Sequence, residues 1–310
     1  MSNANCKYRG IFPAFYAPYT ASGEVSTELA KSFALHLAEQ GVHGLYVGGS
    51  SGECIYQSLA ERKAVLEAVV EAVGSDLTII AHVACNNTAD SCELARHAES
   101  LGVAAIAAIP PIYFRLGRQA IAKYWSEISA AASQTDFFIY NIPQLAGVAL
   151  DPELLQLMLE NPRLRGVKNS SMPVIDIANF LQIGRAKRPD FTVFNGPDEQ
   201  LYSGLVAGAT GGIGGTYAAF PELYLALYQA AVSGQGDLAG KLQVAANQYI
   251  SQLVSYDGNL YAVAKALIKA RCGIDLGSVR APLPGLSTAD QERLSELYQL
   301  VAAIKSEFSL

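Results

Sequence analysis

The sequence predicts an α/β fold, a (β/α)8 barrel with additional C-terminal helices. Eight short apolar segments, rich in β-branched and aromatic residues, alternate with longer amphipathic segments. No antiparallel hairpin signal lies between them, which leaves a closed barrel or a doubly wound open sheet. Eight is the number of parallel strands that closes such a barrel, so we prefer the barrel.

The expected strands follow one another at regular intervals. They lie at residues 10–19, 44–49, 78–84, 104–111, 137–143, 166–170, 191–196 and 210–217. Helical patterns separate them, as at residues 26–40, 59–73 and 88–101, and run from Ser, Thr or Asp toward a glycine-containing exit. After the eighth strand only helical patterns follow, and the first of these completes the barrel. We therefore expect a barrel of residues 1–232 and a helical extension of residues 233–310, packed together as one structural unit.

Composition excludes several classes of partner. Of 310 residues, 51% are hydrophobic and 16% charged, and the net charge is −6 with acids and bases interleaved. Nucleic acid is an unsuitable partner because it requires a basic face. The first ten residues contain no apolar secretory segment. The longest largely apolar run, residues 101–114, is too short to span a bilayer and contains two prolines. We expect a cytoplasmic protein with no membrane or nucleic-acid partner.

The cysteines give no sign of disulfides or of a metal centre. They are odd in number and scattered, without a CxxC pair or a histidine at ligand spacing. They are Cys6, Cys54, Cys85, Cys92 and Cys272. This pattern indicates a reducing compartment and no metal site.

In a (β/α)8 barrel, active sites are built where the strands end and the βα loops begin. After the second expected strand comes "GGSSGE", in which Ser50 and Glu53 have the spacing of a helix capping box. The same turn offers two hydroxyls and free backbone N–H groups for a carboxylate. It is not a P-loop, because no Gly-Lys-Ser/Thr follows.

Other polar residues at strand ends have ordinary structural interpretations. Tyr140 in "IYNIP" can be a core tyrosine, and Tyr113 in "PPIYF" can belong to subunit packing. Asp198 and Glu199 can be acids at a helix start. The stretch "GGIGGTY" lacks the order of a dinucleotide-binding fingerprint.

Lys168, in "GVKNSS", is different because a lysine inside a buried parallel strand has few structural reasons to be there. Burial disfavours the ammonium ion, so the amine is a nucleophile near neutral pH. A neutral amine can attack a ketone to form a Schiff base. The protonated imine then accepts the electrons of a breaking carbon–carbon bond without a metal.

These residues together resemble a known family, the pyruvate-dependent class I aldolases that include N-acetylneuraminate lyase and dihydrodipicolinate synthase. The resemblance extends from "GIFPAFYAPYT" to about "PLPGL". Its components are the glycine-rich turn after the second strand, Tyr113 after two prolines, "YNIP" and the lysine of the sixth strand, in this order. Each motif is weak alone, but together they are specific.

The resemblance assigns roles to the residues of the pyruvate half of the site. It implies that Lys168 forms the Schiff base and that Tyr140 transfers protons beside it. Ser50 and Ser51 would hold the pyruvyl carboxylate, with Ser50 also in a hydroxyl relay. Tyr113 would complete that relay from a neighbouring subunit of a homotetramer, a dimer of dimers. The family uses no cofactor beyond the lysine imine.

Within the family the chain is more similar to the lyase branch. "GLYVGGSSGE", "AHVAC", "YNIPQLAGV" and "NGPDE" carry this similarity, and Leu145 stands where the synthase branch has an arginine. The resemblance therefore implies cleavage of N-acetylneuraminate to N-acetylmannosamine and pyruvate. The residues it implies for the sugar part are Asp198, Glu199, Ser170, a backbone contact at Gly196, and the position of Gly215.

Three departures concern mainly the sugar part. Gly215 replaces a serine that contacts the sugar tail, Asn169 replaces a glutamine, and Pro197 replaces an aromatic residue. Loss of one hydrogen bond to a substrate hydroxyl changes affinity by ~0.5–1.5 kcal/mol. An aldolase or dehydratase for another 2-keto-3-deoxy sugar acid is therefore the main alternative. Dihydrodipicolinate synthesis and a non-catalytic barrel that binds a keto acid follow in that order.

Overall fold

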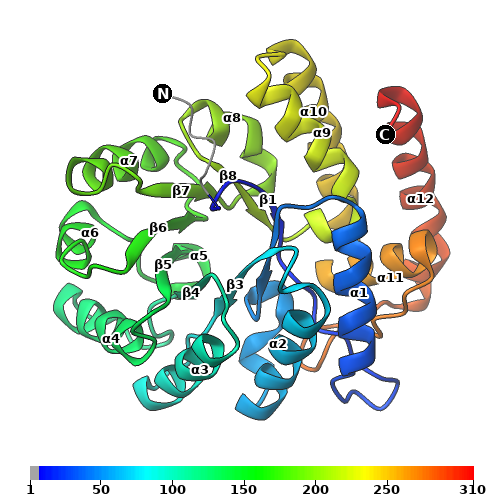
Figure 1. Ribbon diagram of the computed structural model, residues 1–310. Helices are drawn as coiled ribbons and strands as arrows, with labels where there is room; N and C mark the ends of the chain where they lie inside the picture. The colour runs from blue at the N-terminus through cyan, green and yellow to red at the C-terminus, as the bar shows by residue number, and fades with distance from the viewer. Residues whose placement is uncertain (1–6) are drawn as a thin grey trace.

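The computed structural model describes residues 7–310 and forms one barrel of eight parallel strands surrounded by helices (Figure 1). The strands follow the hydrogen-bonded order β1-β8-β7-β6-β5-β4-β3-β2. Their bounds are β1 Gly10–Pro13, β2 Gly44–Val47, β3 Thr78–His82, β4 Ala105–Ala108, β5 Asp136–Asn141, β6 Leu164–Asn169, β7 Thr192–Asn195 and β8 Gly211–Gly214. All eight lie within or overlap the expected segments, so the predicted fold class is confirmed.

The barrel closes between β1 and β2 just beyond the end of β1. Ala14 and Tyr46 form a parallel bridge there, and the Phe15 N–H donates to the Tyr46 carbonyl at 2.9 Å. At the other end of the seam, the His43 N–H donates to the Ile11 carbonyl at 3.0 Å. These bonds place the loop after β2 beside the end of β1.

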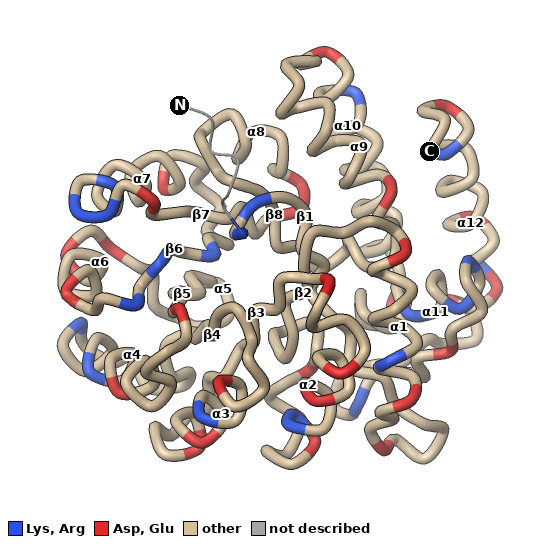
Figure 2. The backbone as a smooth tube through the Cα atoms, viewed as in Figure 1, with Lys and Arg blue, Asp and Glu red and all other residues tan. Residues whose placement is uncertain are grey.

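Helices occupy the outside of the barrel and form the C-terminal part of the chain (Figure 1). Their bounds are α1 Thr27–Glu39, α2 Leu59–Val73, α3 Thr88–Ser100, α4 Arg118–Ala131, α5 Pro143–Ala146, α6 Pro152–Met158, α7 Ile175–Lys187, α8 Leu201–Val206, α9 Pro221–Val232, α10 Gly236–Leu253, α11 Leu260–Cys272 and α12 Thr288–Phe308. Four short 3-10 helices add η1 Ser50–Gly52, η2 Cys54–Tyr56, η3 Asp198–Gln200 and η4 Tyr217–Ala219. Along the outer helices, acidic and basic positions are interspersed (Figure 2).

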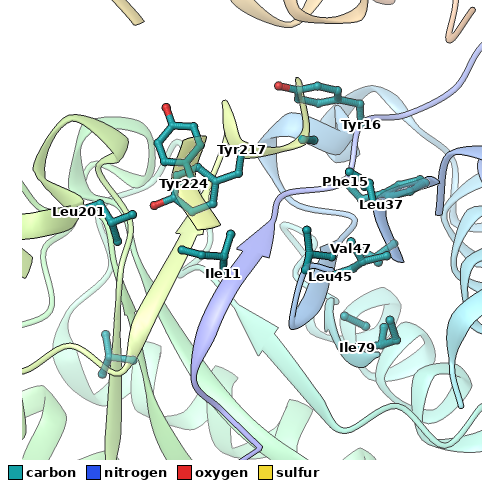
Figure 3. Packing of buried hydrophobic residues seen from close by; sticks show 14 of the residues in the cluster. Ile11, Phe15, Tyr16, Leu37, Leu45, Val47, Ile79, Leu201, Tyr217 and Tyr224 are labelled. Carbon is teal, nitrogen blue, oxygen red and sulfur yellow. The ribbon is translucent and has the colours of Figure 1, made fainter. Parts of the chain in front are cut away.

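The core has two layers because neighbouring residues of a strand face opposite sides. The larger layer lies between strands and helices, and Figure 3 shows Ile11 of β1, Leu45 of β2 and Leu37 of α1 within it. The smaller layer fills the barrel with aromatic side chains, including Phe138 and Phe194. A polar side chain that points into the barrel is thus surrounded by rings.

The proposed capping box of Ser50 and Glu53 is wrong. Glu53 adopts a left-handed conformation with φ 53°, which ends η1 after three residues. Its carboxylate is buried, accepting from Lys265 Nζ at 2.8 Å and from the Arg280 N–H at 2.7 Å. The capping box lies one turn later, where Ser58 and Glu61 cap α2 reciprocally. A buried carboxylate here requires a counter-ion, and α11 supplies it.

The α11 helix is therefore tied to the barrel end that carries the loop after β2. The α9 helix ends at Val232, as the expected boundary requires, but α11 reaches back to the loop after β2 through Lys265. The division at residue 232 stays a prediction. The part that would be called an extension holds a barrel loop in place.

Other expectations concern cysteines, metals and membranes. Cys54, Cys85, Cys92 and Cys272 are free thiols, and Cys6 lies outside the described residues. Within residues 7–310, no cluster of three or more His, Cys, Asp or Glu side chains is arranged to hold a metal ion. Over the same range, none of the helices has the length and apolar character needed to cross a membrane.

We predict that Lys265→Met lowers the free energy of unfolding by ~3–5 kcal/mol, because it leaves the Glu53 carboxylate buried without its counter-ion. The ion pair is almost fully enclosed, with side-chain exposures of 1% and 0%. Denaturant titration measures the change.

The matched control is Lys269→Met in the same helix, whose pair with Asp275 is exposed to solvent and should contribute little to stability. Equal losses in the two variants would show that the buried pair does not anchor the loop.

Candidate active site

Lys168 lies near the end of β6 and points into the barrel, where it is 4% exposed. In the sheet register it pairs with Tyr140 of β5 on one side and Phe194 of β7 on the other. Its Nζ atom is 4.0 Å from the ring centroid of Tyr140 and 4.1 Å from that of Tyr46. The amine is therefore held between two aromatic rings inside the barrel.

Burial lowers the pKa of Lys168 to about 7, and the negative charge of Asp198 opposes this shift. Within residues 7–310, no carboxylate forms an ion pair with Lys168. A substantial fraction of the amine is thus neutral near pH 7, as nucleophilic attack on a ketone requires.

Tyr140 is buried beside Lys168 on the neighbouring strand. Burial raises its pKa to about 12, while the Ser50 and Ser170 hydroxyls act in the opposite direction. The phenol is therefore protonated at neutral pH. It can give a proton to an oxygen that leaves from a carbon bound to Lys168.

A cavity of about 220 Å³ opens at the C-terminal ends of the strands, above these two residues. Nine of the ten expected site residues line it. They are Ser50, Ser51, Tyr140, Lys168, Ser170, Gly196, Asp198, Glu199 and Gly215. The structure thus brings together side chains from the loops after β2, β6, β7 and β8.

The two serines belong to η1, directly after β2. Ser51 is buried and Ser50 is half-buried. The first N–H groups of a helix have no carbonyl partner within it, so this turn offers backbone donors as well as hydroxyls. The arrangement suits a small anion such as a carboxylate.

Asp198 has one bonded and one open carboxylate oxygen. Its Oδ2 accepts from the Thr216 N–H at 2.7 Å and from Thr216 Oγ1 at 2.6 Å. Its Oδ1 is buried and has no hydrogen-bond partner within residues 7–310. Burial raises the pKa of Asp198 to about 6. Glu199 beside it is exposed.

Gly215 is not a glycine by necessity. A Cβ atom there would lie 3.3 Å from Ser51 Oγ and 3.9 Å from Tyr261 Cε1, and its backbone does not have a left-handed φ. The fold therefore accommodates a small side chain at this position with a slight adjustment of Ser51. The space that a serine would fill is part of the cavity.

Tyr113 is the one expected residue outside the cavity. It is 89% exposed with a φ of 83°, and it lines a separate hollow with Phe114. Its ring packs edge to face on that of Phe114. Its expected role in a neighbouring subunit's site stays a prediction.

Sequence reasoning missed several residues at the site, among them Tyr46, Tyr261 and Met172. Tyr46 contacts Lys168 from β2, and Tyr261 and Met172 line the cavity. Tyr46 lies in the quoted motif "GLYVGG", and its inward side follows from strand alternation. Tyr261 comes from α11, and its sequence context contains no comparable signal.

The comparisons with known proteins agree with this geometry. Residues 7–301 match the dihydrodipicolinate synthetase family. An N-acetylneuraminate lyase of Mediterraneibacter gnavus is 55% identical over 97% of this chain and 95% of its own length. An N-acetylneuraminate lyase 2 of Escherichia coli O6:H1 is 33% identical over 94% of each chain.

Solved structures give the same result. A catalytic lysine mutant of a Ruminococcus gnavus sialic acid aldolase superposes with a TM-score of 0.96 at 54% identity, covering 99% of this chain and 100% of that one. The match extends through the barrel and the C-terminal helices, and the chain belongs to the dihydrodipicolinate synthetase family.

Proposed function

We propose that the protein is a class I aldolase that cleaves N-acetylneuraminate to N-acetylmannosamine and pyruvate. The observation that carries this proposal is the Lys168 amine, buried against Tyr140 in a cavity with two serines for a carboxylate. The similarity to the N-acetylneuraminate lyase of Mediterraneibacter gnavus supports the substrate, and the sialic acid aldolase relative supports a lysine-dependent reaction.

The reaction begins with formation of an imine. Ser50 and Ser51 bind the carboxylate of the open-chain keto acid, which directs the ketone carbon toward Lys168. The neutral amine attacks that carbon and forms a carbinolamine. Tyr140 donates its proton to the carbinolamine oxygen, which leaves as water, and a protonated imine and a phenolate remain.

The second stage breaks the carbon–carbon bond. The Tyr140 phenolate takes the proton of the hydroxyl group on the scissile carbon, whose C–O bond becomes the carbonyl of the departing aldehyde. The electron pair of the broken bond moves toward the protonated imine and gives an enamine. The Tyr140 phenol, which now carries the proton of that hydroxyl, gives it to the enamine carbon and so restores the protonated imine. Water then adds to the imine carbon, pyruvate is released, and the Lys168 amine and the Tyr140 phenol are regenerated.

The sugar part lies on the side of the cavity formed by the loops after β6, β7 and β8. The unpartnered Oδ1 of Asp198 accepts a hydrogen bond from a substrate hydroxyl, and exposed Glu199 accepts from another. Ser170 and the backbone of Gly196 add further polar contacts. Gly215 adds space and no hydroxyl, so this position accepts a bulkier group than a serine-bearing site does.

We further propose a cytoplasmic homotetramer, a dimer of dimers. The exposed Tyr113 and Phe114 support this assembly, because two large aromatic side chains on one loop are suited to contact a second copy. In that assembly the Tyr113 hydroxyl completes the relay through Ser50 and Tyr140 of the neighbouring subunit.

We predict that pyruvate and borohydride together add a reduced pyruvyl group to the peptide that carries Lys168, because the imine is reduced to a stable amine. Peptide mass spectrometry measures the adduct. Lys168→Ala should give no adduct and lower kcat by at least ~10³-fold, since the nucleophile is lost.

Lys241→Ala, which removes an exposed lysine of α10, is the control and should behave as the parent. An unmodified Lys168 peptide would remove the Schiff-base mechanism.

We predict that the trapping rate with pyruvate and cyanoborohydride falls as the pH is lowered through about 7, where Lys168 becomes protonated. The charge of Asp198 raises the pKa of Lys168, so Asp198→Asn lowers that pKa and moves the midpoint to lower pH. The trapping rate of each variant across this range gives the midpoint.

Glu199→Gln is the matched control, because Glu199 is exposed and is not among the charges that shift the Lys168 pKa. A midpoint that moves upward in Asp198→Asn would contradict this electrostatic account.

We predict that N-acetylneuraminate is cleaved faster than other 2-keto-3-deoxy sugar acids, because Asp198 and Glu199 accept hydrogen bonds from a polyhydroxylated tail. Pyruvate release from a panel of such acids, measured as kcat/KM, tests the substrate. Faster turnover of another acid would favour the alternative aldolase or dehydratase, for which the space at Gly215 is the specific argument.

A further inference from the structure

The Lys168 amine has aromatic faces where a buried cation usually has a carboxylate. The ring centroids of Tyr46 and Tyr140 lie 4.1 Å and 4.0 Å from Nζ. The two rings meet edge to face, with centroids 5.6 Å apart and an interplanar angle of 80°. Asp198 acts on Lys168 only as a charge, since the two side chains form no ion pair.

This arrangement matters because the nitrogen carries a positive charge in the protonated imine, from the loss of water until the electron pair of the broken bond forms the enamine. A free ammonium ion can lose its charge by giving up a proton. A protonated imine that gives up its proton also loses its ability to accept electrons. In a buried site, a positive charge is costly unless something nearby stabilises it. The face of an aromatic ring attracts a cation by ~2 kcal/mol when the pair is desolvated.

Tyr46 contacts Lys168 through its ring and not through its hydroxyl. The Tyr46 hydroxyl is buried and makes no hydrogen bond within residues 7–310. The backbone is fixed by the bridge to Ala14 and the bond from Phe15 at the barrel seam. Gly49 lies against the ring, since a Cβ there would come within 2.7 Å of Tyr46 Cε1. The ring is therefore held in one place beside Nζ.

We propose that Tyr46 is a further catalytic residue, whose ring face stabilises the positive charge of the protonated imine on Lys168. This inference rests on the Schiff-base mechanism proposed above. It assigns to β2 a direct part in the chemistry, beyond carrying the two serines of the following turn.

The proposed role of Tyr46 predicts the direction in which the midpoint of the pH profile moves when its ring is lost. The groups that face Lys168 are Asp198, which is the charged one, the phenols Tyr46 and Tyr140, and His82, which is neutral because burial lowers its pKa to about 3. Loss of the ring face removes a stabiliser of the cation, so the trapping midpoint moves to lower pH. A loosened, hydrated site would instead move it upward, toward the ordinary pKa of lysine.

The test compares three variants with the parent protein in pyruvate trapping and in cleavage of N-acetylneuraminate. Tyr46→Phe keeps the ring face and loses only the unpartnered hydroxyl, so it is the reference for the other two variants. Tyr46→pentafluorophenylalanine keeps the shape but reverses the charge distribution of the ring face, and Tyr46→Leu removes the ring. Both should lower kcat by roughly tenfold to thirtyfold and move the midpoint to lower pH.

The outcomes separate the two proposals. If Tyr46→pentafluorophenylalanine matches Tyr46→Phe in rate and midpoint while the parent forms the adduct, the role of the ring is overturned and the Schiff-base mechanism stands. An upward midpoint in the folded Tyr46→Leu protein would also overturn it. If the parent forms no adduct with pyruvate, the proposed function itself fails, and this inference with it.

Discussion

Desolvation of the Lys168 amine is the physical constraint that the site depends on. The side chain points into a barrel filled with aromatic rings, where water no longer solvates the ammonium ion and the pKa falls to about 7. The fold keeps the amine in this state by providing no ion-pair partner within residues 7–310. A carboxylate in contact with Nζ would restore an ordinary ammonium ion and remove the nucleophile.

The neighbours of the amine share the same low-dielectric environment but respond to it differently. Burial keeps the Tyr140 phenol protonated and raises the pKa of Asp198 to about 6, because each group loses solvation in its charged form. One environment thus yields a neutral nucleophile, a proton donor and a weakly basic carboxylate. The serine turn after β2 differs because backbone N–H groups and hydroxyls favour an anion there. The cavity is therefore polar at the serine turn and aromatic around the Lys168 amine.

Much of the fold and of the candidate site could be predicted from the sequence, because the residues that form a strand and those that end it are neighbours in the chain. Each apolar segment predicted a strand, and the polar residues at or just beyond its end predicted the site candidates, such as Lys168 in "GVKNSS". Contacts between segments that are far apart in the sequence leave no such local pattern. Glu53 has the spacing of a capping residue, yet its carboxylate turns to Lys265 of α11, 212 residues later. Tyr261 was missed for the same reason, because only the folded chain brings α11 over the barrel.

The pairing of Glu53 with Lys265 has a consequence for synthesis of the chain. The ribosome synthesises all eight strands, with Lys168, before residue 265 emerges, so the barrel strands can associate early. The Glu53 carboxylate cannot be buried without its counter-ion, and the serine turn beside it therefore stays unfinished until α11 and the Arg280 amide arrive. Lys168 therefore reaches its place in the barrel before the serine turn is complete, and that turn is completed only when α11 has docked.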